Sequence, residues 1–168
     1  NSRVDHDNAS VAVSAAWDPR GLYVFTALEG SRAVSVIDAW NRRELLRFDT
    51  GRAPQGLTSS PDGRTLYVHN FMDRSVTVHD IGGTIDGLET PPSLTATLNC
   101  ISTEKLTPVV LKGKQLFYDT KDARTSQQEY ISCAACHNEG GEDGRVWDFA
   151  GLGEGLRNTI SLRGRSGT

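Results

Sequence analysis

The residues best suited to chemistry are two cysteines three positions apart, followed at once by a histidine. Residues 133–137 read Cys-Ala-Ala-Cys-His, which is the C-x-x-C-H pattern of c-type haem attachment. Two thiols on one helical turn can reach the two vinyl groups of a haem, and the adjacent histidine can bind the iron. The motif therefore predicts one covalent haem c held by Cys133 and Cys136, with His137 as the metal ligand.

The same five residues have three alternative interpretations. Half of a zinc site would need two further ligands at a similar spacing, and the sequence holds no second cysteine pair. A thioredoxin-like redox pair would need a βαβ context, which the neighbouring sequence lacks. A chance match is the third alternative, because the motif is short. The remaining cysteine, Cys100, is interpreted as a small buried apolar residue.

Two helices are predicted around the motif. Ser132 is suited to cap a short helix that carries the two cysteines. A longer helix is predicted over residues 108–119, since Thr107 can act as its N-cap and Pro108 suits its first position. The apolar residues of this helix recur at helical spacing; they are Val109, Val110, Leu116 and Phe117.

The first hundred residues differ from the rest in composition and contain a repeat. Residues 1–102 hold nine arginines and no lysine, whereas all four lysines lie in the last 66 residues. A shift of 42 positions aligns Gly21 with Gly63 and Asp38 with Asp80. A period in the low forties with about four strands per unit is typical of β-propeller blades. The predicted domains are residues 1–102, with propeller blades, and residues 103–168, with the haem motif.

Composition excludes two classes of partner. The chain has 168 residues, a net charge of −3 and a pI of about 5.8, so it lacks the basic field that nucleic-acid binding needs. No apolar run approaches the roughly 18 residues of a membrane-spanning helix. Hydrophobic residues make up 37% of the chain, which is enough for a folded core.

The repeat also resembles a known family. The segments "SPDGRTLYVHN" and "SVTVHDI" resemble the YVTN-type propeller repeat, and the resemblance covers residues 8–102. Propellers of this kind usually have about six or seven blades, whereas this stretch is long enough for about two. An incomplete propeller cannot bury its own core. We therefore expect the remaining blades in other chains or in further parts of a longer protein.

The second part of the chain resembles another family. The stretch "LKGKQLFYDTKDARTSQQEYISCAACHNEGGEDGRVWDF", followed by "GEGLRNTISLRGR", resembles the bacterial di-haem cytochrome c peroxidases, which include the methylamine-dehydrogenase maturation enzymes. The resemblance covers residues 104–168 and implies an α-helical cytochrome c-like module. It also implies that Phe117 packs at the haem edge and that Arg157 and Asn158 belong to the cofactor site. An arginine matches the geometry of a haem propionate.

The chain departs from that family in three respects. A second haem motif is absent, Ile160 stands where the family usually has proline, and the sequence given ends 31 residues after His137. We therefore expect an incomplete haem module. The predicted fold is mixed, with a partial β-propeller followed by an α-helical cytochrome c-like module.

The predicted function is electron transfer by a haem protein that works with a redox partner protein. Because haem c is attached outside the cytoplasm, we expect a periplasmic or extracellular location. The chain would then be part of a larger peroxidase-like protein or assembly. The alternatives are a peroxidase or oxidase with an open iron position, and a propeller-based interaction module in which the haem is accessory.

A second iron ligand is not expected from residues 138–168, because they contain neither histidine nor methionine. The other sources are another chain, a segment outside this sequence, water, or the side chains of His6, His69, Met72 and His79. Three carboxylates and two glycines between Glu139 and Asp143 are a minor indication of a calcium site.

Overall fold

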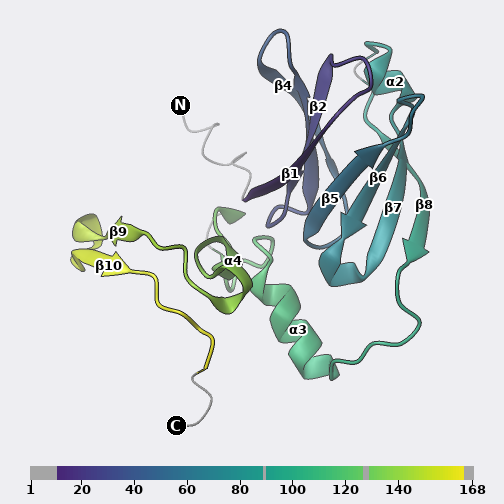
Figure 1. Ribbon diagram of the computed structural model, residues 1–168. Coiled ribbons are helices and arrows are strands. Elements are labelled where there is room, and N and C mark those ends of the chain that lie inside the picture. The colour runs from purple at the N-terminus through teal and green to yellow at the C-terminus, as the bar shows by residue number, and fades with distance from the viewer. Residues whose placement is uncertain (1–10, 89, 127–128, 165–168) are drawn as a thin grey trace.

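Eight strands between residues 12 and 99 form two similar antiparallel sheets, as Figure 1 shows for this computed structural model. The structure describes residues 11–88, 90–126 and 129–164. The first sheet contains β1 (Ala12–Trp17), β2 (Tyr23–Leu28), β3 (Ala33–Asp38) and β4 (Arg43–Asp49). The second contains β5 (Pro54–Ser59), β6 (Thr65–Asn70), β7 (Ser75–Asp80) and β8 (Ser93–Asn99). In each sheet the strands pair in chain order, which confirms the predicted propeller blades.

The repeat period is the same for three strands of each blade. The first three strands begin at residues 12, 23 and 33, and their counterparts begin 42 positions later, at 54, 65 and 75. The fourth strands begin at 43 and 93, which is a spacing of 50. The extra residues of the second blade lie between β7 and β8, where the one-turn helix α2 (Gly82–Ile85) also lies.

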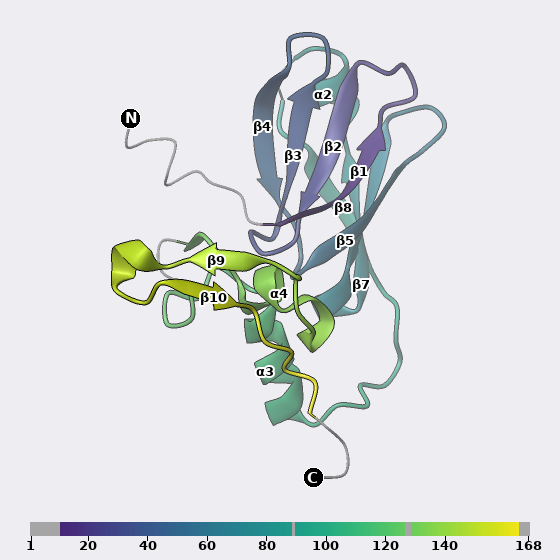
Figure 2. The same ribbon diagram turned by 60° about the vertical axis from the view of Figure 1, so that its left-hand side comes forward.

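The core lies between the two sheets. Apolar side chains from both blades are buried together there; they are Phe25, Val34, Val36, Phe48, Leu66, Val68, Ile81 and Ile85. Burying each of these side chains stabilises the fold by roughly 1.5–3 kcal/mol. β5 runs beside β1 and β2, and Figure 2 shows the two sheets from the side of these neighbouring strands.

The predicted α-helical cytochrome c-like module is wrong. Among the described residues after 102, only α3 (Pro108–Phe117) is longer than a single turn. The rest contains the one-turn helix α4 (Cys133–Cys136), the 3₁₀ turns η3 (Asn138–Gly140) and η4 (Ala150–Leu152), and a hairpin of β9 (Val146–Asp148) and β10 (Leu156–Asn158). Seven glycines lie between residues 140 and 164, and glycine interrupts regular helices. Four of them, at 140, 144, 153 and 155, have a positive φ that a helix cannot contain.

Helix α3 begins as predicted but packs only at its end. The Thr107 hydroxyl accepts a hydrogen bond from the backbone N–H of Val110, and Pro108 takes the first helical position. The expected apolar face is nevertheless largely uncovered, since Val109 is 82% exposed and Val110 is 54% exposed. Only the end of the helix, near Phe117, packs against the propeller part.

None of the helices in the described parts of the chain has the length and hydrophobicity needed to cross a membrane.

Candidate functional site

The two motif cysteines are the first and last residues of α4. Both thiols are free, with Cys133 exposed and Cys136 half-buried. The third free thiol, Cys100, is exposed as well, so its interpretation as a buried residue is wrong. Ser132 takes the N-cap position with extended backbone angles, as predicted. Its hydroxyl makes no capping hydrogen bond, however, and is buried without a partner among the described residues. The segment before α4 is held by Ser126 instead, whose hydroxyl donates to the Ile131 carbonyl at 2.8 Å.

A cavity of about 530 Å³ opens beside the motif, and we call it the motif cavity. Its lining residues are Tyr130, Ile131, Cys136, His137, Trp147, Phe149, Arg157, Asn158, Thr159 and Ile160. The structure thus brings together four of the six site residues that the sequence predicted. A volume of this size is typical of sites for small ligands and cofactors.

The β9–β10 hairpin supplies the wall opposite α4. Trp147 pairs with Arg157 across the two strands, so these side chains share one face of the hairpin. The Trp147 indole N–H donates to the Asp143 carboxylate at 2.9 Å, and the Arg157 guanidinium donates to Glu154 at 3.0 Å. Trp147 was not among the predicted site residues, although the alternation of Val-Trp-Asp could have indicated a strand with the indole ring on one face.

The His137 ring is oriented by the loop that follows it. Its Nδ1 lies 3.3 Å from the Gly141 carbonyl oxygen, and a proton on Nδ1 directed at that carbonyl leaves Nε2 as the atom available to a metal. Burial raises the pKa of the neighbouring Cys136 thiol, and the negative charge of Asp143 raises it further. The Cys136 thiol, the oriented imidazole and the aromatic-walled cavity fit a covalently attached haem, whereas the Cys133 thiol is exposed at the other end of α4.

Phe117 and Cys133 do not line the motif cavity. Phe117 packs instead beside Tyr118, with ring centroids 5.4 Å apart. Both belong to a small cluster that also contains Met72 and Ala134. Because Ala134 lies in α4, this cluster fixes one side of the motif helix to the second blade.

Equivalent loops of the two blades hold the motif-bearing segment. Arg32 and Arg74 occupy the same repeat position, 42 residues apart, and both have left-handed backbone angles, with φ of 53° and 50°. The Arg32 Nε donates to the Asp119 carboxylate at 2.9 Å, and the Arg74 Nε lies 2.7 Å from Glu104. Both partners belong to the segment that carries α3, so each blade contributes one anchoring arginine.

A pair of backbone carbonyls reinforces this attachment. The Gly30 carbonyl accepts hydrogen bonds from the Thr120 N–H at 3.0 Å and from its hydroxyl at 2.8 Å. The equivalent carbonyl of the second blade, at Met72, accepts a longer bond of 3.5 Å from the Gln115 side chain.

The candidates for a second iron ligand lie apart from the motif cavity. Met72 is buried in the cluster with Tyr118, and His79 is buried on β7 with its ring 5.0 Å from that of Phe48. His69 is exposed on β6. None of the three lines the motif cavity, and His6 lies outside the described residues.

The carboxylates between residues 139 and 143 have other partners. Asp143 accepts from the Arg145 backbone N–H at 3.0 Å and from Trp147, while Glu139 lies 3.7 Å from the Arg163 guanidinium. Within the described ranges, no three His, Cys, Asp or Glu side chains are grouped as ligands for a metal ion. The calcium site stays a prediction from the sequence.

No family model matches the sequence, and no curated protein matches it either. Several solved structures are similar to part of it. Hydrazine synthase of Kuenenia stuttgartiensis is 21% identical, with a TM-score of 0.46 over 54% of this chain and 23% of that chain. The β-propeller domain of Cps50 (Swd1) from Myceliophteria thermophila is 15% identical, with a TM-score of 0.47 over 53% of this chain and 29% of that chain. The periplasmic gluconolactonase of Pseudomonas aeruginosa is 21% identical, with a TM-score of 0.46 over 57% of this chain and 28% of that chain. This chain covers less than a third of each of these proteins.

Proposed function

We propose that this protein carries one haem c, attached by thioether bonds to Cys133 and Cys136 and ligated by His137, and that it transfers electrons outside the cytoplasm. The observation that carries the proposal is that Cys136 and His137 of the C-x-x-C-H motif share an aromatic-walled cavity of about 530 Å³. When bound, a haem supplies an iron centre that exchanges one electron at a time.

The residues around the cavity have distinct roles in this proposal. The rings of Tyr130, Trp147 and Phe149 provide an apolar wall, which would keep water from a buried macrocycle. Arg157 is 56% exposed at its side chain and offers a planar donor for a haem carboxylate. The Gly141 carbonyl holds His137 through Nδ1, so that Nε2 would remain the ligand atom.

The location and partners follow from the same proposal. Covalent haem attachment outside the cytoplasm implies a periplasmic or extracellular protein. Two blades leave sheet faces without a neighbour, and a propeller needs adjoining blades to bury them. We infer that the protein acts within a larger protein or assembly and exchanges electrons with a redox partner protein.

Haem attachment is tested by producing the chain in the periplasm of a host with a cytochrome c maturation system. Denaturing electrophoresis stained for haem is expected to show a band at the size of the chain, and acid-acetone extraction should leave the haem on the protein. Cys133→Ala combined with Cys136→Ala should remove the band, whereas Cys100→Ala, which alters the third free thiol, should keep it. Haem that is extracted from the unaltered chain would refute covalent attachment.

The spectrum of the haem-loaded protein separates electron transfer from peroxide chemistry. Two strong axial ligands give a low-spin iron, which is the result expected for electron transfer. A high-spin, five-coordinate iron that reacts with hydrogen peroxide would favour a peroxidase instead. His137→Ala should abolish the low-spin signal while the haem band of the denaturing gel remains.

A further inference from the structure

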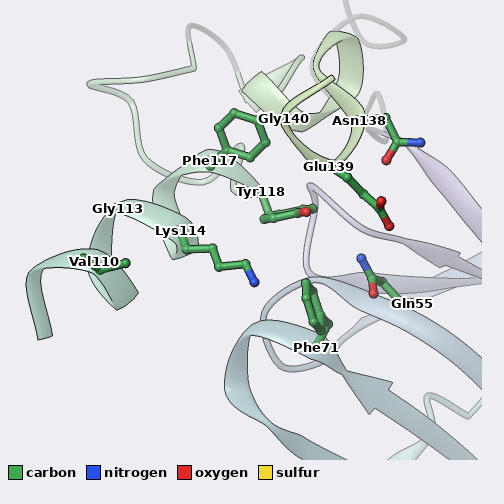
Figure 3. Close-up of a pocket in the computed structure, with 10 residues that line it drawn as sticks. All are labelled: Gln55, Phe71, Val110, Gly113, Lys114, Phe117, Tyr118, Asn138, Glu139 and Gly140. Carbon is green, nitrogen blue, oxygen red and sulfur yellow. The ribbon is translucent and has the colours of Figure 1, made fainter. Parts of the chain in front are cut away.

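A second cavity, of about 690 Å³, lies between the propeller part and the motif-bearing segment, and we call it the junction cavity. It is bounded by β5, η1 (Phe71–Asp73), α3 and η3 (Figure 3). The lining side chains that matter for its chemistry are Gln55, Phe71, Lys114, Phe117, Tyr118 and Glu139. None of them lines the motif cavity, so the two cavities are separate sites.

Aromatic rings provide the apolar part of the junction cavity. Tyr118 packs edge-on against Phe71, with ring centroids 5.7 Å apart, and against Phe117 at 5.4 Å. These contacts fix the three rings relative to one another, and aromatic surfaces of this kind favour an apolar or aromatic ligand group.

A positive charge lies on the α3 side. The Lys114 ammonium is 4.8 Å from the centroid of the Phe71 ring and is directed into the cavity (Figure 3). Within the described part of the chain it has no carboxylate partner at ion-pair distance. An ammonium held in this way is suited to bind a carboxylate.

Three further polar side chains line the junction cavity (Figure 3); they are Gln55, Tyr118 and Glu139. The Gln55 side-chain N–H donates to the buried Glu29 at 2.6 Å, so its carbonyl oxygen is left as an acceptor. Burial raises the pKa of the Tyr118 hydroxyl, and the negative charges of Glu29 and Glu139 raise it further. Of these two carboxylates, that of Glu139 lines the junction cavity.

Glu139 is placed at the cavity by an unusual backbone conformation. Its φ is 50°, a left-handed value that non-glycine residues adopt only at some cost. Among the described residues, its carboxylate pairs with the Arg163 guanidinium at 3.7 Å, where both side chains are mostly exposed. Such a pair contributes little, so the Glu139 carboxylate can also accept from an ammonium group.

We propose that the junction cavity binds a small zwitterion of the α-amino-acid class with an apolar or aromatic side chain. Its carboxylate would meet Lys114, its ammonium group would meet Glu139 and the Gln55 carbonyl, and its side chain would lie against the aromatic rings. A simple anion would meet Glu139 and a simple cation would meet Lys114, so a molecule with both charges suits the cavity best. This proposal does not depend on haem attachment.

The test measures binding of three related probes to the full chain by isothermal titration calorimetry. L-Phenylalanine has both charged groups, phenethylamine lacks the carboxylate, and 3-phenylpropanoate lacks the ammonium group. We expect L-phenylalanine to bind about tenfold more tightly than either analogue, because each charge-assisted contact contributes roughly this factor.

Two variants test which side chain of the cavity binds which charged group of the ligand. Lys114→Met should weaken phenylalanine binding about tenfold and leave phenethylamine unchanged. Glu139→Gln should weaken phenylalanine and phenethylamine but leave 3-phenylpropanoate unchanged. Lys112→Met and Glu142→Gln are matched controls, since both residues are exposed and neither lines the cavity.

Circular dichroism first establishes that each variant retains the sheet signal of the unaltered chain. Equal affinity for the three probes, or no binding by a folded chain, would overturn the proposal. So would a loss of binding in the two control variants as large as that in Lys114→Met and Glu139→Gln.

Discussion

His79 belongs to a chain of buried polar side chains within the propeller part. The Asn70 amide donates to the Thr77 hydroxyl at 3.0 Å, and the His79 Nε2 lies 3.0 Å from the same hydroxyl. The other ring nitrogen, Nδ1, is buried without a partner among the described residues. Burial lowers the pKa of His79 below its ordinary value of 6.5, because a charged imidazolium would lose its hydration there.

This burial predicts a stability that depends on pH. Below pH 6.5 the unfolded chain takes up a proton at residue 79 while the folded chain stays neutral, so the free energy of unfolding falls as the pH decreases towards the lowered pKa. His79→Leu should reduce that dependence between pH 7 and pH 5. Urea unfolding at several pH values measures this pH dependence of the free energy of unfolding.

The matched control for His79 is His69, which is exposed on the neighbouring strand β6. His69→Leu should leave the pH dependence of unfolding as it is in the unaltered chain. If His69→Leu reduced the dependence as much as His79→Leu, burial of His79 would not be its cause.

The ion pair between Arg32 and Asp119 predicts a coupling between the first blade and the end of α3. The Asp119 side chain is only 5% exposed and that of Arg32 is 29% exposed, so removal of either partner leaves a poorly solvated charge. Asp119→Ala should lower the free energy of unfolding by about 1–3 kcal/mol. The double variant that combines Asp119→Ala with Arg32→Ala should lose less free energy of unfolding than the two single variants lose together.

The corresponding control uses a pair of exposed side chains, Arg64 and Asp86. Arg64→Ala should have little effect on the free energy of unfolding, since exposed ion pairs contribute little. Additive effects of Arg32→Ala and Asp119→Ala in chemical denaturation would show that the pair does not stabilise the attachment.

At the scale of elements, α3 is a helix with few tertiary contacts. It contains no buried residue, so its stability depends largely on its cap and on helix propensity. Thr107 and Pro108 provide the N-terminal signals, whereas Gly113 in the middle weakens the helix. The helix is therefore expected to open locally more easily than the strands of the blades.

Gly113→Ala should stabilise α3 locally by about 0.5–1 kcal/mol. A Cβ atom at this position meets nothing within 4 Å, so no clash opposes the gain in helix propensity. Slower amide hydrogen exchange in residues 108–117 measures the effect, and unchanged exchange there would contradict it.

Gly51→Ala is the opposite case and serves for comparison. A Cβ atom at residue 51 would lie 2.6 Å from the Asp73 carboxylate and 2.7 Å from the Asn70 side chain. Because this approach is closer than van der Waals contact, the substitution should destabilise the propeller part.

At the scale of the whole molecule, the second blade has one covered face and one open face. Leu66 and Val68 face the first blade in the core, whereas alternate residues of the same strands face away. Strand pairing places Tyr67 with Val78 and His69 with Val76 and Leu98 on that second face. Tyr67 is 37% exposed and Leu98 is 54% exposed, since no other sheet of the described residues covers this face.

This open face predicts self-association of the isolated chain. Sedimentation velocity at increasing concentration should show dimers or larger species, because exposed apolar faces promote contact between copies. Tyr67→Ser combined with Leu98→Ser should reduce the association. Leu152→Ser, at an exposed position in η4, should not, and equal effects of the two changes would refute the role of this face.

The sequence by itself determined the elements whose signals are local. The 42-residue repeat predicted the blades because alternating side chains and turn residues act over a few positions. Thr107 and Pro108 marked the start of α3 for the same reason. The C-x-x-C-H motif likewise predicts haem attachment at Cys133, Cys136 and His137 from a spacing within five residues, and this stays a prediction.

Tertiary structure alone decided what lies around the motif. The aromatic wall depends on the pairing of Trp147 with Arg157 across a hairpin, and the anchoring of the segment depends on Arg32 meeting Asp119, 87 residues away. Local sequence patterns do not specify such distant contacts. The predicted α-helical module failed for a different, local reason, because the family resemblance indicated helices while the glycines after residue 140 favoured turns. The arrangement of the junction cavity, which joins Gln55 of β5 to Glu139 of η3, likewise follows from packing between distant segments.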